Sequence, residues 1–150
     1  MYPDLLLLKS LTLKNLVKGE ESEEYGACQF EINHKRILFR TGKITPTKMG
    51  LFVTLWKRIE NGPILPYDVE DPFDLFLISV RTPEHFGQFV FPKTILYEKD
   101  ILSKERKGGK RAMRVYPPWD ITDNPQAKKT QKWQLLHFFT DPEATSKLFT

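Results

Sequence analysis

Apolar and polar residues alternate over residues 28–33, which read CQFEIN. An alternation of period two places neighbouring side chains on opposite faces of an extended chain, so this segment predicts a half-buried strand. After a tight turn at Asn33-His34, residues 35–41 predict a second strand that completes a hairpin. In this second strand the side chain of Arg40 is expected on the same face as that of Leu38.

A helical pattern follows from residue 45 to residue 59. Thr45 suits the N-cap, and Pro46 suits the first helical position, because the N–H that proline lacks has no partner there in any helix. The sequence therefore predicts a helix that packs on the sheet and ends at Gly62-Pro63. Its inward face is defined by apolar residues that recur at helical spacing: Met49, Phe52, Val53, Trp56 and Ile59.

The rest of the chain predicts further strands and helices. Residues 74–80 (DLFLISV) are apolar almost throughout, which is typical of a central strand, and residues 88–91 (QFVF) are its expected hairpin partner. We also expect a short helix at 93–99, a strand at 111–117 and a terminal helix at 126–139. This order of elements predicts the α+β class, as a single domain with a mixed β-sheet flanked by helices.

The length of 150 residues suits one domain with a substantial core. Residues 1–22 are expected to form an N-terminal lead-in helix or linker, and residues 23–150 the folded domain. Asp4 and Lys9 flank the leucine run too closely for a membrane span or a signal peptide, so no membrane association is expected. The single cysteine, Cys28, excludes a disulfide framework and favours a reducing compartment, the cytoplasm.

Charge is distributed unevenly along this chain, whose formal net charge is +4. No acidic residue occurs between Glu31 and Glu60, whereas the preceding segment at 20–24 is rich in glutamate. Such segregation predicts a local positive field that attracts an anionic partner. The candidate contacts in this segment are Arg40, Lys43, Lys48, Lys57 and Arg58.

A second basic stretch, from residue 109 to residue 133, interleaves cations with aromatic rings. Cations neutralise phosphates and flat rings stack on unpaired bases, so the pattern favours a nucleic-acid contact. The alternative is a solvated charged surface whose aromatic residues anchor the core, with Trp133 as the clearest anchor. The candidate contacts are Lys110, Arg111, Arg114, Tyr116, Trp119, Lys128, Lys129 and Lys132.

Catalytic motifs are poorly represented. The three histidines show no metal-ligand spacing, and no serine-nucleophile or phosphate-binding glycine motif is present. A metal-dependent nuclease hairpin would need an acid on one strand and an E-x-K unit on the next, but here Leu38 and Arg40 replace that unit. If the protein is a nuclease, Glu31, Asp71 and Asp74 are the candidate ligands of Mg²⁺, with Arg40 beside them. We otherwise expect no catalytic residue, no metal and no cofactor.

Several long blocks resemble the MepB-like family: KITPTKMGLFVTLWKR, GPILPYD, DLFLISV, GQFVFPK, GKRAMRVYPPWD and AKKTQKWQL. The resemblance extends over about residues 20–140. It implies a bacterial cytoplasmic protein whose family takes its name from a gene neighbouring a multidrug efflux pump. It also implies a core similar to that of restriction endonucleases of the PD-(D/E)XK type, able to bind nucleic acid without an established catalytic activity.

Together these observations favour a nucleic-acid-binding protein, with DNA as the ligand and single-stranded DNA as one option, and a degenerate nuclease-like core with no catalysis of its own. DNA versus RNA and strand preference do not follow from the sequence. Two alternatives stay open. One is an active metal-dependent nuclease, and the other is a protein-interaction partner in drug-efflux regulation. Nucleic acid is therefore the expected partner and a protein partner is the second, whereas the oligomeric state does not follow from the sequence.

Overall fold

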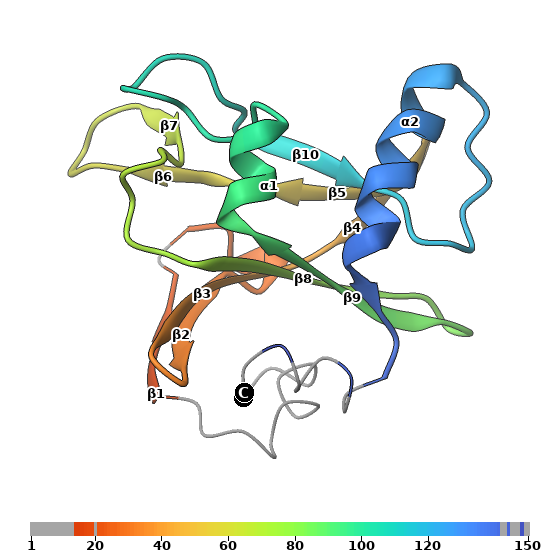
Figure 1. The fold of residues 1–150 in the computed structure, drawn as a ribbon, viewed down its shortest axis with the longest axis horizontal. Coiled ribbons are helices and arrows are strands. Elements are labelled where there is room, and N and C mark those ends of the chain that lie inside the picture. The colour runs from red at the N-terminus through yellow and green to blue at the C-terminus, as the bar shows by residue number, and fades with distance from the viewer. Residues whose placement is uncertain (1–13, 20, 142–143, 145–147, 149–150) are drawn as a thin grey trace.

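The computed structural model describes residues 14–19, 21–141, 144 and 148. Among the described residues, one long mixed sheet, two smaller antiparallel sheets and two α-helices surround the core (Figure 1). The long sheet contains β1 (Lys14–Lys18), β2 (Cys28–Ile32), β3 (Lys35–Thr41), β8 (Leu75–Arg81), β9 (Phe86–Pro92) and β11 (Phe138–Phe139). The order of its strands is β1-β2-β3-β8-β9-β11.

The segment between β3 and β8 forms most of the second layer. It contains β4 (Lys43–Thr45), β5 (Lys48–Thr54), β6 (Trp56–Arg58) and β7 (Ile64–Pro66). Strand β10 (Ala112–Val115) joins β5 and β4 in a three-stranded sheet, and β6 pairs with β7. Helices α1 (Lys93–Glu98) and α2 (Pro125–Gln134) lie on the same side of the long sheet as this layer (Figure 1).

The pairing of β3 with β8 is parallel, whereas the other pairs in the long sheet are antiparallel. A parallel pair cannot be closed by a tight turn, so the chain has to leave the sheet and return to it. Residues 42–74 make this crossover. Because both ends of the crossover lie in the sheet, the second layer is held against one face of it.

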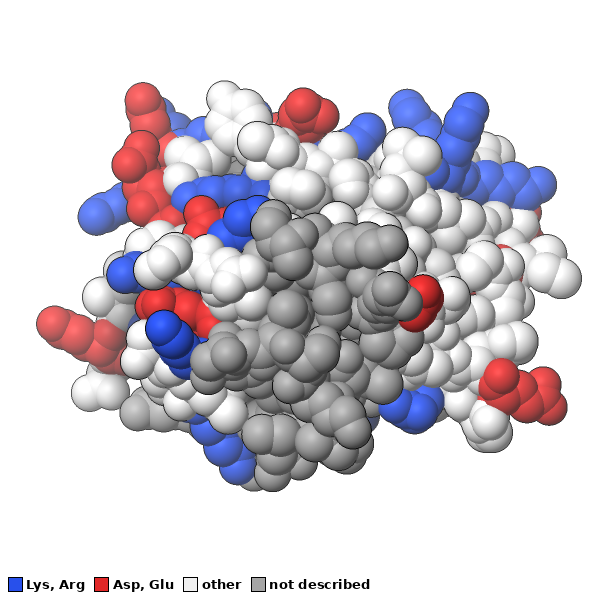
Figure 2. Space-filling view, turned by 60° about the horizontal axis from the view of Figure 1, so that its bottom comes forward, with Lys and Arg blue, Asp and Glu red and all other residues white. Residues whose placement is uncertain are grey.

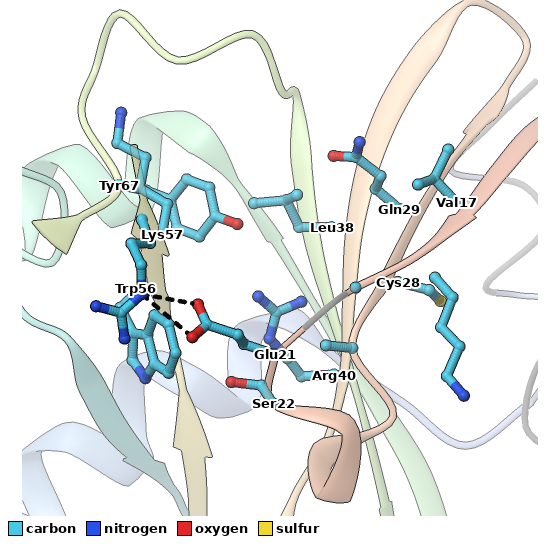
Figure 3. Close-up of a pocket in the computed structure, with 14 residues that line it drawn as sticks. Val17, Glu21, Ser22, Cys28, Gln29, Leu38, Arg40, Trp56, Lys57 and Tyr67 are labelled. Atoms are coloured by element: carbon cyan, nitrogen blue, oxygen red, sulfur yellow. Dashed lines mark hydrogen bonds and ion pairs between the residues drawn. The ribbon is translucent and has the colours of Figure 1, made fainter. Parts of the chain in front are cut away.

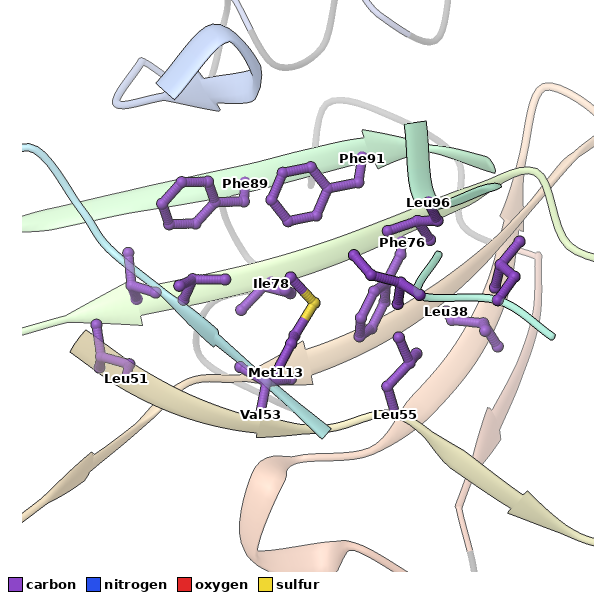
Figure 4. Packing of buried hydrophobic residues seen from close by; sticks show 14 of the residues in the cluster. Leu38, Leu51, Val53, Leu55, Phe76, Ile78, Phe89, Phe91, Leu96 and Met113 are labelled. Atoms are coloured by element: carbon purple, nitrogen blue, oxygen red, sulfur yellow. The ribbon is translucent and has the colours of Figure 1, made fainter. Parts of the chain in front are cut away.

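Each face of the long sheet buries its own hydrophobic cluster. The main cluster fills the space below the second layer and the helices, and it includes Phe76, Ile78, Phe89 and Phe91 (Figure 4). Alternate residues of β2, β3 and β8 form a smaller cluster on the opposite face. Since β8 supplies both clusters, it is apolar on both faces, as the run DLFLISV predicted.

Several predictions from the sequence are confirmed. Strands β2 and β3 form the expected hairpin, and both residues of its turn have positive φ, 49° at Asn33 and 68° at His34, as a two-residue type I′ turn requires. The strand at 74–80 is central, with the segment around 88–91 as its hairpin partner, and the short helix follows it. The fold class, an α+β single domain with a mixed sheet, is also confirmed.

The predicted helix at 45–59 is wrong. This segment forms β5 and β6, and within it Leu51, Val53 and Leu55 are buried at period two while the residues between them are more exposed. Strand β5 pairs with β10 from Leu51↔Val115 to Thr54↔Ala112. The backbone N–H and C=O groups of β5 are therefore used in a ladder of hydrogen bonds between strands. The aromatic and β-branched residues of the segment suit this ladder better than a helix.

Two other predictions differ from the structure in part. Of the lead-in at 1–22, residues 1–13 lie outside the described residues, and Lys14–Lys18 forms an exposed strand paired with β2 instead of a helix. The terminal helix ends at Gln134 instead of residue 139. A short 3₁₀ turn, Leu135–His137, follows it and leads into β11, where Phe138 packs against Phe89 on β9.

Asp68 joins two loops that flank the second layer. Its Oδ1 accepts hydrogen bonds from Ser103 Oγ at 2.6 Å and from the Arg106 N–H at 3.0 Å, and its Oδ2 accepts one from the Glu70 N–H at 3.0 Å. The bond from Ser103 contributes most to lowering the pKa of Asp68, which falls to about 2. The charged form of the carboxylate is therefore the form that holds these loops together.

We predict that Asp68→Asn lowers the melting temperature at neutral pH. An Asp in an unfolded chain has a pKa of about 3.9, so the stabilisation by Asp68 is complete above that pH and is lost as the pH falls towards the folded-state pKa of about 2. The gap in melting temperature between wild type and variant should therefore close between about pH 4 and pH 2. Asp100→Asn, which changes an exposed acid paired with Lys104, is the control. A gap that does not change with pH would contradict the assignment.

Candidate nucleic-acid interface

The residues predicted to contact nucleic acid fall into two groups in space. The first group is Arg40, Lys43, Lys48, Lys57 and Arg58, which belong to β3 to β6 and the connections between them. The second group belongs to β10, to the segments on either side of it and to α2. The two groups differ in whether acidic side chains lie beside them.

Most cations of the first group are paired. Lys43 Nζ lies 2.8 Å from Glu24 Oε2, and Arg58 Nε lies 3.1 Å from Glu21 Oε1. The hydrogen bond with Glu24 raises the pKa of Lys43. Glu21 and Glu24, from the glutamate-rich segment that precedes the hairpin, thus supply counter-charges to the basic segment that follows it. Charge that is segregated along the chain is balanced in the folded protein.

The other three members of the first group have separate environments. Lys57 Nζ is 2.6 Å from Asp71 Oδ1 in a pair that is largely shielded from solvent. Arg40 is only 5% exposed, on the face of β3 that the alternation predicted, so it is not part of the exposed basic surface. Lys48 is exposed at the start of β5 and forms no ion pair with any residue that the structure describes.

The second group is organised by contacts between α2 and β10. Helix α2 begins at Pro125, and the side chain of Asn124 caps it by accepting a hydrogen bond from the Ala127 N–H at 2.8 Å. Gln134, at its last turn, is completely buried. Its Nε2 donates to the Arg114 carbonyl at 2.9 Å, and its Oε1 accepts from the Tyr116 N–H at 2.9 Å. One amide therefore satisfies both backbone groups at the end of β10.

Gln131, one turn earlier on α2, holds the loop that follows β10. Its Nε2 donates to the carbonyl oxygens of Pro117 at 2.9 Å and Asp120 at 3.0 Å. The two glutamines thus fix the helix relative to the strand and to the Pro117-Pro118 turn. Neither was predicted as a functional residue, because an amide in a polar helix carries no sequence signal for the backbone groups that it will meet.

A groove of about 360 Å³ lies between α2, β10 and the end of α1. We call it the basic groove, because three cations and no acidic side chain are among the described residues that line it. The aromatic rings of Tyr116 and Trp133 and several side-chain amides complete its wall. Its lining residues are Lys99, Ile101, Lys110, Met113, Arg114, Tyr116, Asn124, Gln126, Ala127, Thr130, Trp133 and Gln134.

Exposed cations surround the basic groove. Lys110 and Arg111 precede β10, and Lys128, Lys129 and Lys132 lie on the solvent side of α2. Among the residues that the structure describes, none of these five side chains forms an ion pair. Figure 2 shows basic side chains that project together on the side of the molecule where α2 lies (upper right), whereas acidic and basic side chains alternate at the opposite edge. The positive field is thus concentrated around α2.

The aromatic and arginine candidates differ in how far contacts within the protein already occupy their side chains. Tyr116 lines the basic groove and packs against Gly50, where an added Cβ would lie 2.8 Å from its ring. Trp119 is stacked on His85, with ring centroids 4.8 Å apart and an interplanar angle of 9°, so one of its faces is covered. Arg114 also supports the fold, since its Nη2 donates to Thr45 Oγ1 at 2.8 Å.

Sequence reasoning missed Lys99 as part of this site. Lys99 follows α1, about thirty positions before α2, and its Nζ lies 5.5 Å from the centre of the Trp133 ring. Nothing in its local sequence connects it to α2, so only the packing of α1 beside α2 brings it into the groove. Trp133 is half-buried against the main cluster, as predicted for a core anchor, and it also lines the groove.

The candidate nuclease residues are not gathered into one metal site. Asp71 binds Lys57, Glu31 lies 3.8 Å from Arg36 Nε, and Asp74 Oδ2 accepts a hydrogen bond from the Arg36 N–H at 2.8 Å. Among the described residues, no three side chains of the His, Cys, Asp and Glu types are close enough to hold a metal ion together. Each of the three acids therefore has a structural partner in the folded chain.

The architecture defines this chain as a single α+β domain. Comparison with known proteins places it further. A sequence model of the MepB-like family matches residues 19–140. A crystal structure of MepB is similar at 39% sequence identity with a TM-score of 0.82, over 93% of this chain and 97% of that chain. The chain belongs to the MepB-like family.

A second solved structure, the bacterial homing endonuclease I-Ssp6803I, matches at 14% identity and a TM-score of 0.45, over 98% of this chain and 90% of that chain. A likeness of this degree carries no argument about activity. None of the curated protein sequences compared with the chain matches it. Within the described residues, no helix is long and apolar enough to cross a membrane.

We predict that Gln134→Leu destabilises the protein by about 2–4 kcal/mol, because it leaves the Arg114 carbonyl and the Tyr116 N–H buried without partners, each at a cost of about 1–3 kcal/mol. Urea denaturation measures the change. Gln126→Leu, the same substitution at an exposed position of the same helix, should have little effect. Equal stabilities of the two variants would show that Gln134 does not hold α2 to β10.

Proposed function

We propose that this protein binds nucleic acid, with single-stranded DNA as the preferred form, through the basic groove and the lysines on the outer side of α2. The observation that supports this most directly is the composition of the groove. Lys99, Lys110 and Arg114 line it together with aromatic rings, and no described acidic side chain does. Phosphates need the cations and unstacked bases need the rings, and the groove offers both.

The arrangement favours a single strand over a duplex. A duplex hides its bases, so a protein that binds it without base contacts gains nothing from an aromatic ring in the binding groove. In a single strand a base is free to stack, and Tyr116 presents a ring on the wall of the groove. The lysines of α2 then neutralise phosphates on either side of the stacked nucleotide.

The proposed role is binding without catalysis. Arg40, in the position of the nuclease lysine, is buried and cannot accept a proton at any accessible pH. The acids that a nuclease would use have structural partners, as described above. Incubation with plasmid and single-stranded DNA in Mg²⁺ or Mn²⁺ tests this point. Cleavage that is abolished by Glu31→Gln would replace the binding role with a nuclease.

Replacing Lys128, Lys129 and Lys132 together with Gln should weaken binding to a labelled single strand and reduce its salt dependence. Each phosphate contact that is lost lowers the slope of log affinity against log salt by about 0.7 for a single strand. Fluorescence anisotropy at about 50 mM and about 200 mM salt measures both effects.

A matched control makes the same change in net charge at three lysines that lie outside α2. Lys35, Lys43 and Lys104 bind the Leu148 carbonyl, Glu24 and Asp100, so their replacement with Gln removes three charges that already have protein partners. This control should bind much like the wild type. Equal losses in both triple variants would show that only net charge matters, and wild-type protein that does not bind any strand would refute the proposal.

Tyr116→Leu should weaken single-strand binding by about 1–3 kcal/mol if a base stacks on the ring, and it should affect duplex binding much less. The backbone hydrogen bond from residue 116 to Gln134 does not depend on the side chain, so the fold should be retained. Circular dichroism checks the fold, and anisotropy with single and double strands measures the selectivity. An equal effect on both forms of DNA would exclude stacking at Tyr116.

A further inference from the structure

A second pocket, separate from the basic groove, contains a buried cation. It has a volume of about 360 Å³ and shares no lining residue with the groove. Strands β2 and β3 form its floor, the segment that contains Trp56–Arg58 and Tyr67 forms one wall, and residues 17–19, 21 and 22 border it. Figure 3 shows Arg40 in this pocket, between Glu21 and Leu38.

Arg40 has no counter-ion among the described residues. Its Nη1 donates to the Phe39 carbonyl at 2.8 Å, while its buried Nε has no hydrogen-bond partner. A guanidinium is a permanent cation, so its burial without a counter-ion is costly. An anion in the pocket would supply both the missing charge and the missing acceptor.

The acid that lines the pocket is committed to another partner. Glu21 receives hydrogen bonds from Arg58 Nε at 3.1 and 3.2 Å, one to each carboxylate oxygen. In Figure 3 the dashed lines from the Glu21 carboxylate run towards Trp56, and no ion pair joins Glu21 to Arg40. The described lining contains four cations, Lys18, Arg40, Lys57 and Arg58, and this one acid. Arg58 pairs with Glu21 and Lys57 with Asp71, so the preference for an anionic ligand rests on Arg40.

Neutral polar groups reach the same space from other elements. The hydroxyl of Tyr67 points into the pocket from the wall opposite β3 (Figure 3). Gln29 pairs with Leu38 in the hairpin register, so its side chain lies on the same face of the sheet as Arg40. Donors that approach from three directions suit a tetrahedral oxyanion. A planar carboxylate is satisfied by the two parallel hydrogen bonds of a single guanidinium.

We propose that this pocket binds a phosphate monoester, with Arg40 as its central ligand and Tyr67 and Gln29 as further donors. A pocket of this volume has room for more than the phosphate itself. The phosphate has two possible sources, a free 5′-mononucleotide or the 5′-phosphorylated end of a strand. Only the second source rests on the function proposed above, because only it requires binding of a nucleic acid.

Thermal unfolding and calorimetry test the site with four probes: inorganic phosphate, a 5′-mononucleotide, a 5′-phosphorylated oligonucleotide and the same oligonucleotide with a 5′-hydroxyl. Chloride at equal ionic strength is the reference. A ligand at about 100 times its Kd should raise the melting temperature by about 5–10 °C. A rise with the mononucleotide assigns a small molecule, and a rise with only the 5′-phosphorylated strand assigns a strand end. No rise with any phosphate-bearing probe overturns the proposal.

Arg40→Met separates the site from general charge effects. The variant should be at least as stable as the wild type without ligand, because an uncompensated buried charge is removed, and the rise caused by the probe should vanish. Lys48→Met, which removes the same charge from an exposed position, should respond like the wild type. A response of Arg40→Met equal to that of the wild type overturns the proposal.

Tyr67→Phe provides an independent variant if Arg40→Met does not fold. Loss of the hydroxyl should weaken binding of the phosphate probe about tenfold, and unchanged affinity overturns the proposal. The triple replacement of Lys128, Lys129 and Lys132 distinguishes the two sites. It should leave mononucleotide binding intact. An error in the proposed role of the basic groove and an error in the proposed role of the Arg40 pocket would therefore give different results.

Discussion

The parallel pairing of β3 with β8 is the constraint on which the rest of the structure depends. It runs from Ile37↔Leu75 to Thr41↔Ser79 and forces residues 42–74 to leave the sheet and return to it. That crossover becomes the second layer, which closes the main core and covers the end of β3. Arg40 is buried as a consequence, since it lies on the face of β3 that the crossover covers. One choice of strand direction thus determines the core and one of the two candidate sites.

Electrostatic pairing decides where the surface is left positive. Glu24 and Glu21, which precede β2, lie against the basic segment from β3 to β6, where they pair with Lys43 and Arg58. Exposed pairs of this kind contribute little stability, but they cancel the field that the cations would otherwise produce. Within the part of the chain that the structure describes, no acidic side chain lines the groove beside α2. The unbalanced positive charge therefore lies at the basic groove, although the segment from β3 to β6 is also rich in lysine and arginine.

The two candidate sites use cations in different ways. Around the basic groove the lysines are exposed and well hydrated, so their attraction for an anion is long-ranged, weak for each contact and screened by salt. Arg40 is held in a low-dielectric environment by the strands around it, where one contact is strong and depends on geometry. The first arrangement suits an extended polyanion and the second suits one phosphate. The difference between the two sites comes from how deeply their cations are buried, and not from which residue types carry the charge.

The sequence by itself determined the elements whose pattern is local. Alternation in CQFEIN, the Asn33-His34 turn and the apolar run of β8 predicted the hairpin and the central strand correctly, because a period of two and a positive-φ turn depend only on near neighbours. The tertiary structure alone decided the rest. Residues 45–59 carry both a helical and an alternating pattern, and pairing with β10 selects the strand. Likewise Gln134, Lys99 and Arg40 acquire their roles from segments more than a dozen positions away that pack around them, which no local pattern encodes.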